Sequence, residues 1–168
     1  MPVFTSLNRI LLPLLLLLLV HPAVAAPDHD DQAALQGLSQ GKGVFLLDFT
    51  SPNKTAFYLD IIKGTHARLL RQEVEPDFVV VFIGRTVEFL TTEPRDEIDM
   101  EYGKQLEQIA ATAESLDELG VRMEVCAVAT DAFNVDNSTV LPSMHVVGDG
   151  FISLIGWQSQ GYHLVPVF

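Results

Sequence analysis

The chain alternates short, nearly continuous apolar runs with longer stretches in which apolar residues recur at helical spacing. Apolar runs of this length are typical of strands that are buried on both faces of a sheet. The pattern predicts strands at residues 44–49, 78–83, 121–125, 144–147 and 162–167. It predicts one helix after an N-cap at Ser51 or Asn53, and others at residues 100–119, 126–133 and 148–160. A helical turn is expected at residues 85–90 and an exposed loop at residues 91–99.

Five strands with intervening helices predict a three-layer α/β domain, in which helices cover both faces of a mainly parallel five-stranded sheet. Pro166 lacks a backbone N–H, so the last strand is expected at an edge of the sheet or at the chain end. In such sheets, ligands and reactive groups gather at the carboxyl ends of the strands. Residues that directly follow a strand are therefore the first candidates for a functional site.

The first 25 residues have the pattern of a signal peptide. Arg9 precedes an apolar run at residues 10–20, and Ala23-Val24-Ala25 has the small residues of a cleavage site. This run is shorter than the roughly 18 apolar residues that a membrane span requires. We therefore expect cleavage after Ala25 rather than a membrane anchor, and a periplasmic or secreted protein. Residues 26–42 would then form a polar segment, and residues 43–168 a single domain without a membrane span.

The chain is acidic, with a formal net charge of −12. Removal of the leader takes away Arg9 and no acidic residue, which gives −13. Such a surface repels phosphates and anionic headgroups, so nucleic acids and membrane surfaces are poor candidates for partners. His29 among aspartates lacks the ligand count of a tight metal site, and no His–Cys–His spacing suits zinc. Neither a metal nor a cofactor is expected.

Cys126 is the only cysteine, and it lies where a predicted strand meets a predicted helix. The free N–H groups of a helix start favour negative charge, and the thiolate is the reactive form of cysteine. Cys126 is therefore the candidate functional residue. Two alternatives stay open. Free cysteines are often small buried apolar residues, and a lone thiol in an oxidising compartment can also pair with another molecule.

Other residues are weaker candidates for binding at the same edge of the sheet. Gly84 and Gly148 each follow a predicted strand, and Ser51 lies in the loop after the first one. Gly148 begins a Gly-Asp-Gly turn that either binds an anion or is simply flexible. His145 could share a site with Cys126 if both reach this edge, although a structural histidine is the more common case.

Several segments resemble the DsrE/DsrF-like family. The C-terminal block from Leu154 to Pro166 is similar to the family's closing helix and strand, with its glutamine, Gly-Tyr pair and proline. Residues 77–91 resemble its second strand and the segment after it, residues 121–126 match the place where many members carry a cysteine, and residues 50–55 fit the first loop. The resemblance implies a flavodoxin-like domain that assembles into homo-oligomers, either trimers or hexamers.

Two functions remain open. Sulfur-relay members of that family carry sulfur as a persulfide on the cysteine and pass it to a partner protein. The resemblance thus implies that Cys126 is a sulfur carrier, with a sulfur donor or acceptor protein as its partner and at most a sulfurtransferase-like activity. The alternative is a non-catalytic binding or assembly module of the cell envelope, in which Cys126 only fills space.

Overall fold

The computed structural model describes residues 29–167, so the predicted signal peptide lies outside the described residues. The elements below belong to one compact unit that begins at Gln32. In chain order they are α1 (Gln32–Leu35), β1 (Gln40–Leu47), α2 (Pro52–Arg71), β2 (Glu75–Phe82), the 3₁₀ helix η1 (Gly84–Phe89), α3 (Asp96–Glu118), β3 (Arg122–Cys126), α4 (Ala127–Phe133), the 3₁₀ helix η2 (Asn137–Thr139), β4 (His145–Val147), α5 (Gly150–Ser159) and β5 (His163–Val167).

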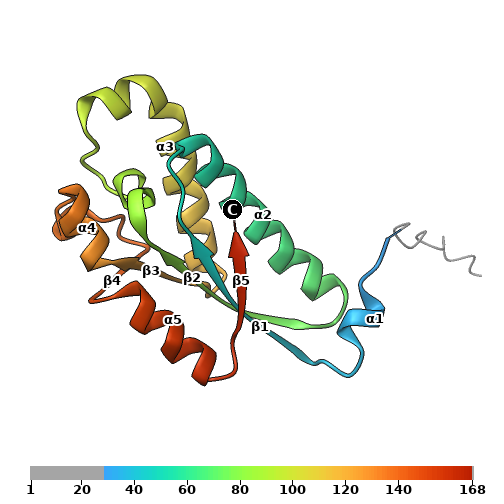
Figure 1. Ribbon diagram of the computed structural model, residues 1–168. Coiled ribbons are helices and arrows are strands. Elements are labelled where there is room, and N and C mark those ends of the chain that lie inside the picture. Colours follow the sequence, from blue (N-terminus) through green and yellow to red (C-terminus); the bar gives the residue numbers. More distant parts are fainter. Residues whose placement is uncertain (1–28, 168) are drawn as a thin grey trace, which may run out of the picture. The chain divides into compact units, whose positions relative to one another are not determined.

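The five strands form one parallel sheet in the order β4-β3-β2-β1-β5. Helices α2 and α3 lie on one face of this sheet and α5 lies on the other (Figure 1). The predicted three-layer α/β fold is therefore confirmed. β5, the strand that contains Pro166, lies at an edge of the sheet, as its missing N–H requires.

Alternate residues of the central strands fill two cores. Phe45, Phe78 and Phe82 belong to the larger cluster beneath α2 and α3, which also contains Leu59, Ile62, Ile109 and Leu116 from these helices. Val44, Val79 and Val81 face the other way and pack against Leu154 of α5. The apolar runs in β1 and β2 thus arise because both faces of these strands are buried.

Three predicted boundaries were wrong, and one of them is the start of β2, which lies at Glu75 instead of Phe78. β1 begins at Gln40 instead of Val44, because Gln40 to Gly43 pair with β2 from Glu75 onward. The glycines at 41 and 43 had suggested a leading segment, but the ladder with β2 accommodates them. α3 begins at Asp96 inside the predicted loop, and acidic residues in its first turn suit the positive end of a helix dipole.

Among the residues that the structure describes, no helix is both long enough and apolar enough to cross a bilayer.

Candidate functional site

The parallel register aligns the carboxyl ends of the strands along one rim of the sheet. Leu47 pairs with Phe82, Phe82 with Val125, and Cys126 with Val147. Gly84, Cys126 and Gly148 therefore lie on this rim or directly beyond it. Ser51 is farther along the loop after β1, where it is the N-cap of α2 and its Oγ accepts a hydrogen bond from the Lys54 N–H at 3.5 Å.

His145 does not reach this rim. It begins β4 and pairs with Glu124, two residues before the rim position that Val147 shares with Cys126. Its side chain is exposed. The structure thus separates His145 from the other predicted site residues, and the edge position of β4 explains its exposure.

Cys126 is the last residue of β3 and lies directly before α4. Only 5 % of its surface is exposed, and it packs against the larger core cluster. Its Sγ accepts a hydrogen bond from the backbone N–H of Gly150 at 3.1 Å. Gly150 is the first residue of α5, so this N–H has no acceptor within the helix. The thiol therefore satisfies a backbone donor at the positive end of a ten-residue helix.

Gly150 allows α5 to begin this close to the sheet. A Cβ at position 150 would lie 2.7 Å from Cγ2 of Ile83 and 3.1 Å from Cβ of Cys126. Asp149 is the N-cap of α5, and its Oδ1 accepts a hydrogen bond from the Phe151 N–H at 2.8 Å. The second glycine of the Gly-Asp-Gly turn, rather than the predicted Gly148, thus supplies the contact with the sulfur.

A buried carboxylate two residues before Cys126 also binds α5. Glu124 is 3 % exposed, and its Oε2 accepts hydrogen bonds from the Ser153 hydroxyl and from Nε1 of Trp157. Its Oε1 accepts a hydrogen bond from Nε of Arg122 at 2.6 Å. Burial opposes ionisation of this carboxyl, but the hydrogen bonds from Ser153, Arg122 and Trp157 outweigh it, so the pKa of Glu124 lies below its ordinary value.

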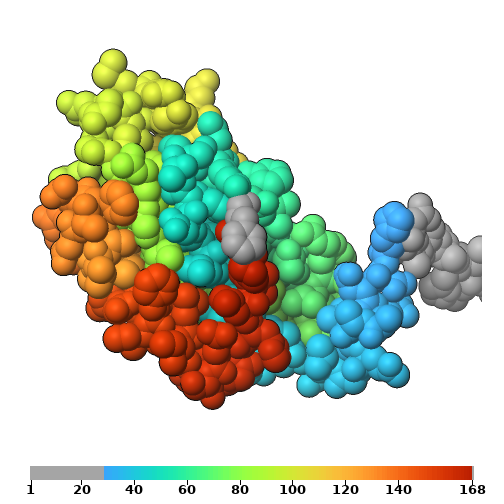
Figure 2. All heavy atoms as spheres, viewed as in Figure 1, coloured from blue at the N-terminus to red at the C-terminus, as the bar shows by residue number. Residues whose placement is uncertain are grey.

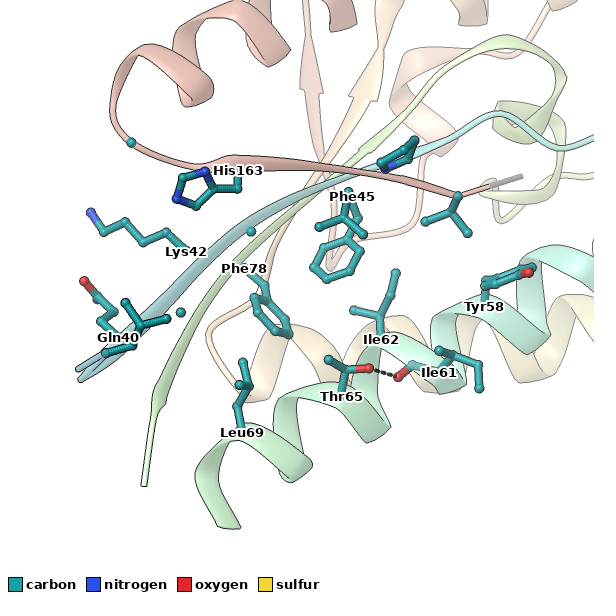
Figure 3. A pocket seen from close by; sticks show the side chains of 17 residues that line it. Gln40, Lys42, Phe45, Tyr58, Ile61, Ile62, Thr65, Leu69, Phe78 and His163 are labelled. Carbon is teal, nitrogen blue, oxygen red and sulfur yellow. Dashed lines mark hydrogen bonds between the residues drawn. The ribbon is translucent and has the colours of Figure 1, made fainter. Parts of the chain in front are cut away.

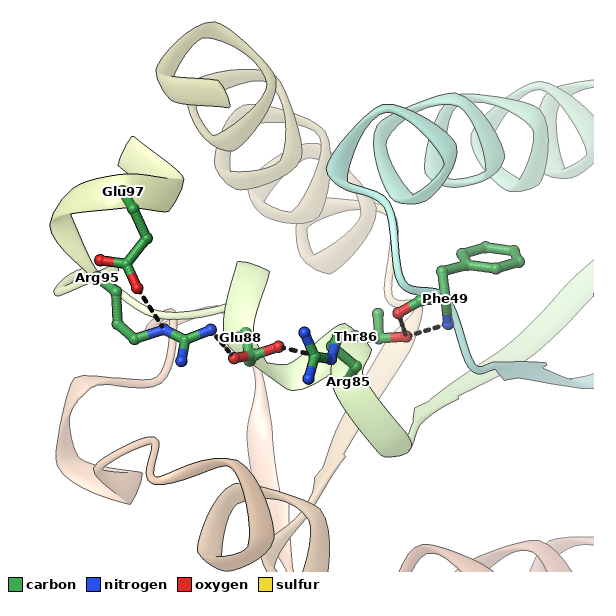
Figure 4. Close-up of polar contacts among 6 residues, drawn as sticks. All are labelled: Phe49, Arg85, Thr86, Glu88, Arg95 and Glu97. Carbon is green, nitrogen blue, oxygen red and sulfur yellow. Dashed lines mark hydrogen bonds and ion pairs between the residues drawn. The ribbon is translucent and has the colours of Figure 1, made fainter. Parts of the chain in front are cut away.

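The rim beyond β2 is held by polar contacts of η1 (Figure 4). The Thr86 hydroxyl donates to the Phe49 carbonyl at 3.2 Å, which joins η1 to the loop after β1. The buried Glu88 forms ion pairs with Arg85 and Arg95. Gly84 has a φ of +56°, and a Cβ there would lie 2.1 Å from Oδ1 of Asp48. Gly84 is therefore required by the turn between β2 and η1 and offers no side chain to a ligand.

Within residues 29–167, no three His, Cys, Asp or Glu side chains gather as a metal site would require. At Cys126 itself, the contacts described above place one thiol beside one backbone donor, the Gly150 N–H. Sequence reasoning identified the thiol but missed Gly150, Glu124, Ser153 and Trp157. The Gly-Asp-Gly turn after β4 was the signal for Gly150, whereas nothing in the sequence alone pairs Glu124 with α5.

Comparison with known proteins gives the family of this fold. The sequence matches the model of the DsrE/DsrF-like family over residues 42–167, which is most of the chain. The chain belongs to the DsrE/DsrF-like family. The matched region of this DsrE/DsrF-like protein includes β1 from Lys42 onward and the other four strands of the sheet, together with Cys126 and Gly150. The predicted family is thus confirmed.

Solved structures that resemble this DsrE/DsrF-like fold include one from Methanobacterium thermoautotrophicum and one from E. coli. The protein of unknown function MTH1491 from Methanobacterium thermoautotrophicum superposes with a TM-score of 0.59 at 19 % identity, over 76 % of this chain and 99 % of its own. The ychN protein from E. coli gives a TM-score of 0.53 at 15 % identity, again over 76 % of this chain and 99 % of its own. No curated protein matches the sequence significantly. At these identities the two likenesses show the fold alone.

Proposed function

We propose that this protein handles sulfur and that Cys126 is the sulfur carrier. The observation that carries the proposal is the hydrogen bond from the Gly150 N–H to Sγ of Cys126 at 3.1 Å, at the carboxyl end of β3. A backbone donor at a helix start favours an anionic sulfur over a neutral one. The chain belongs to the DsrE/DsrF-like family, and the resemblance of residues 121–126 to the place where its sulfur-relay members carry a cysteine supports the same role.

The proposed transfer needs no additional oxidant. The Cys126 thiolate attacks the terminal sulfur of a donor persulfide; a new S–S bond forms at Cys126, and the donor leaves as a thiolate. An acceptor thiolate then attacks the outer sulfur of the Cys126 persulfide, and Cys126 returns to a thiolate. The Gly150 N–H faces sulfur that is anionic at the start and at the end of this cycle. The donor and the acceptor are protein partners in this proposal.

The burial of Cys126 sets a condition for this reaction. Because the residue is only 5 % exposed, a donor reaches the sulfur only after its cover moves. The segment Gly148 to Gly150 is that cover in our proposal, since Gly150 lies against the sulfur while Gly148 is exposed. A Cβ at Gly148 would meet no atom within 4 Å, which leaves room on its outer side.

Alkylation of the native protein tests the carrier role. Cys126 is the only cysteine, so iodoacetamide reports on this one thiol and Cys126→Ser is the blank. We expect the folded protein to be alkylated without denaturant and, after incubation with glutathione persulfide, to gain the mass of one sulfur atom that Cys126→Ser does not gain. A thiol that reacts only after denaturation and takes up no sulfur would refute the carrier role.

The same burial favours a second function, a binding or assembly module in which Cys126 is a packing residue. Its membership of the larger core cluster is the specific observation for this alternative. It predicts that Cys126→Ala folds and retains the biological phenotype of the native protein. Loss of that phenotype in a folded Cys126→Ala variant would instead support the carrier role.

We also propose that the protein is exported after cleavage behind Ala25, to the periplasm or the medium. The support is the charge, apolar run and small residues of segment 1–25. Intact-mass measurement of the protein from its native compartment would show a chain that begins at Ala26. A chain that retains residues 1–25 in that compartment would contradict the proposal.

The protein is further proposed to form homo-oligomers through α5. Phe151, Ile152 and Ile155 are 61 %, 69 % and 65 % exposed and occupy the first turns of this helix. Val128 of α4 is also exposed. The orange and red atoms of α4 and α5 form one continuous part of the visible surface (Figure 2). Exposed bulky apolar residues of this kind mark contact surfaces, and the family resemblance favours a second copy as the partner.

A further inference from the structure

An apolar groove lies on the face of the sheet opposite α5, between α2 and the edge strand β5. Its volume is about 730 Å³, within the range of roughly 300–1,000 Å³ that is common for small-molecule sites. Phe45 and Phe78 of the sheet, Ile62 and Leu69 of α2, and Val165 of β5 are among its lining residues. Figure 3 shows Phe45, Phe78, Ile62 and Leu69 around the hollow, with α2 as one wall.

Two features of the sequence create this groove. β5 pairs with β1 so that Val165 stands beside Phe45 and His163 beside Gly43, on the face that α2 covers over the central strands. Gly41 and Gly43 of β1 line the groove and fill none of it with side chains. A Cβ at Gly43 would lie 3.3 Å from the Phe45 ring, so even a methyl group would crowd the floor. Val165 is consequently 38 % exposed although it belongs to the sheet.

The groove differs in charge from the rest of the molecule. The chain has 22 acidic residues and 10 basic ones, yet none of the described residues that line the groove is Asp or Glu. Its ionisable lining residues are Lys42, Tyr58 and His163. Gln40, Lys42 and His163 lie at one end of the hollow, and Tyr58 lies at the other (Figure 3).

The lining residues indicate the class of ligand, because polar side chains lie at one end of the groove and apolar side chains line most of the rest. Lys42 Nζ lies 3.9 Å from Oδ2 of Asp77, and Gln40 also binds that carboxylate, so these two side chains are partly engaged. His163 is exposed and shares its face with Gly43, which makes it the donor best placed for a ligand's head group. Asp77 does not line the groove, and Lys42 offsets its charge. An anionic head beside His163 is therefore compatible with this end, while the trough takes an alkyl chain.

We propose that this groove binds a single-chain anionic amphiphile of the fatty-acid type, with its carboxylate near His163 and its chain along Phe78 and Phe45. A hollow of this volume has room for such a chain. The groove lies on the face opposite α5, so this binding is independent of Cys126.

Calorimetric titration with two ligands of equal chain length tests the proposal. Dodecanoate and dodecyltrimethylammonium would each be added to the full protein below the concentration at which they form micelles. We expect saturable binding of one dodecanoate per chain, at least about tenfold tighter than the ammonium ligand. Non-specific binding to so acidic a protein would favour the ammonium ligand instead. Equal binding, or a preference for the cation, would therefore overturn the proposal.

Matched substitutions locate the site. Val165→Trp fills the groove and is expected to weaken dodecanoate binding by about tenfold or more. Val146→Trp is the control, because Val146 lies on the other edge strand and is 39 % exposed against 38 % for Val165; its effect is expected to stay within about twofold. Ile61→Trp fills the groove from α2 and replaces Val165→Trp if that variant does not fold.

The head-group position has its own test. His163→Glu places a carboxylate where the ligand's carboxylate is proposed to bind, so dodecanoate affinity should fall by about tenfold while the ammonium ligand binds more tightly. Unchanged dodecanoate affinity in His163→Glu and Val165→Trp would place the ligand elsewhere and overturn the proposal. A different result would show that a second copy of the chain covers the groove. In that case the parent protein binds no dodecanoate, and the Val165→Trp variant dissociates in sedimentation.

Discussion

At the scale of single residues, Gly150 is as important to the candidate site as Cys126. The two touch at the start of α5, where the absence of a side chain brings a backbone N–H within 3.1 Å of the sulfur. The space around Gly150 is closed by Ile83 and by Val81, whose Cγ1 would lie 3.4 Å from an added Cβ. One missing methyl group thus sets how closely α5 approaches the thiol.

Replacement of Gly150 by alanine is therefore expected to destabilise the fold. The new Cβ would lie 2.7 Å from Cγ2 of Ile83, and overpacking of this kind costs about 1–3 kcal/mol. Gly148→Ala is the matched control two residues away, because a Cβ there meets nothing within 4 Å; its effect should stay within about 0.5 kcal/mol. Denaturant unfolding measures both. Equal effects would show that the close approach at Gly150 is not a constraint.

A residue of the site could be predicted from the sequence only where the local pattern of apolar and polar residues determines its position. Cys126 could be found because a strand run ends there, and the parallel strands then place it on the rim. The contact with Gly150 depends on how α5 packs across the sheet, which no spacing reveals. Glu124 is a charged residue within a short apolar strand, and its partners Ser153 and Trp157 lie about thirty residues farther along the chain. Such pairings follow from tertiary packing.

At the scale of elements, β3 and α5 are joined by a line of polar contacts. Cys126 and Glu124 lie on the same face of β3, because side chains two residues apart in a strand point the same way. On α5 their partners are Gly150, Ser153 and Trp157, spaced by three and four residues along one helical face. Glu124 therefore fixes the helix whose first N–H binds the sulfur.

This contact predicts how stability responds to acid. The pKa of Glu124 is below its ordinary value of 4.5 in the folded chain, so the carboxylate stabilises the fold at pH above 4.5 and loses that contribution as the pH falls through the folded value. Glu124→Gln should remove this component and cost about 1–3 kcal/mol at neutral pH. Unfolding free energies between pH 7 and pH 3 measure it. Parallel pH profiles for the two proteins would contradict the role of Glu124.

The elements themselves were largely predictable, whereas their arrangement was not. The apolar runs of β1 and β2 are uninterrupted because both faces of these strands are buried. The edge strands β4 and β5 are largely exposed and were found from shorter apolar runs. Gly41 and Gly43 concealed the start of β1, since glycine is uncommon inside strands and its place here depends on neighbours from α2 and β2. The strand order, with β5 beside β1, determines where the groove opens, and the apolar pattern of β5 alone does not fix which strand it pairs with.

At the scale of the whole molecule, net charge and exposed apolar surface have opposite effects on self-association. A net charge of −12 repels a second copy, while Phe151, Ile152 and Ile155 on α5 favour association. Salt screens the repulsion, with a Debye length of about 8 Å at physiological ionic strength, but leaves apolar contacts intact. If α5 forms the contact between copies, self-association should therefore strengthen as salt is added.

Two substitutions with the same change in charge test which surface forms the contact between copies. Ile152→Glu places a carboxylate in the α5 surface, whereas Met100→Glu places one on α3 at a residue that is 88 % exposed. Sedimentation velocity over a range of protein and salt concentrations should show that Ile152→Glu shifts the protein to monomer while Met100→Glu leaves its oligomers in place. Because both variants add one negative charge, general repulsion would weaken association equally in the two proteins. Equal weakening, or a parent protein that is monomeric at high salt, would argue against α5 as the contact between copies.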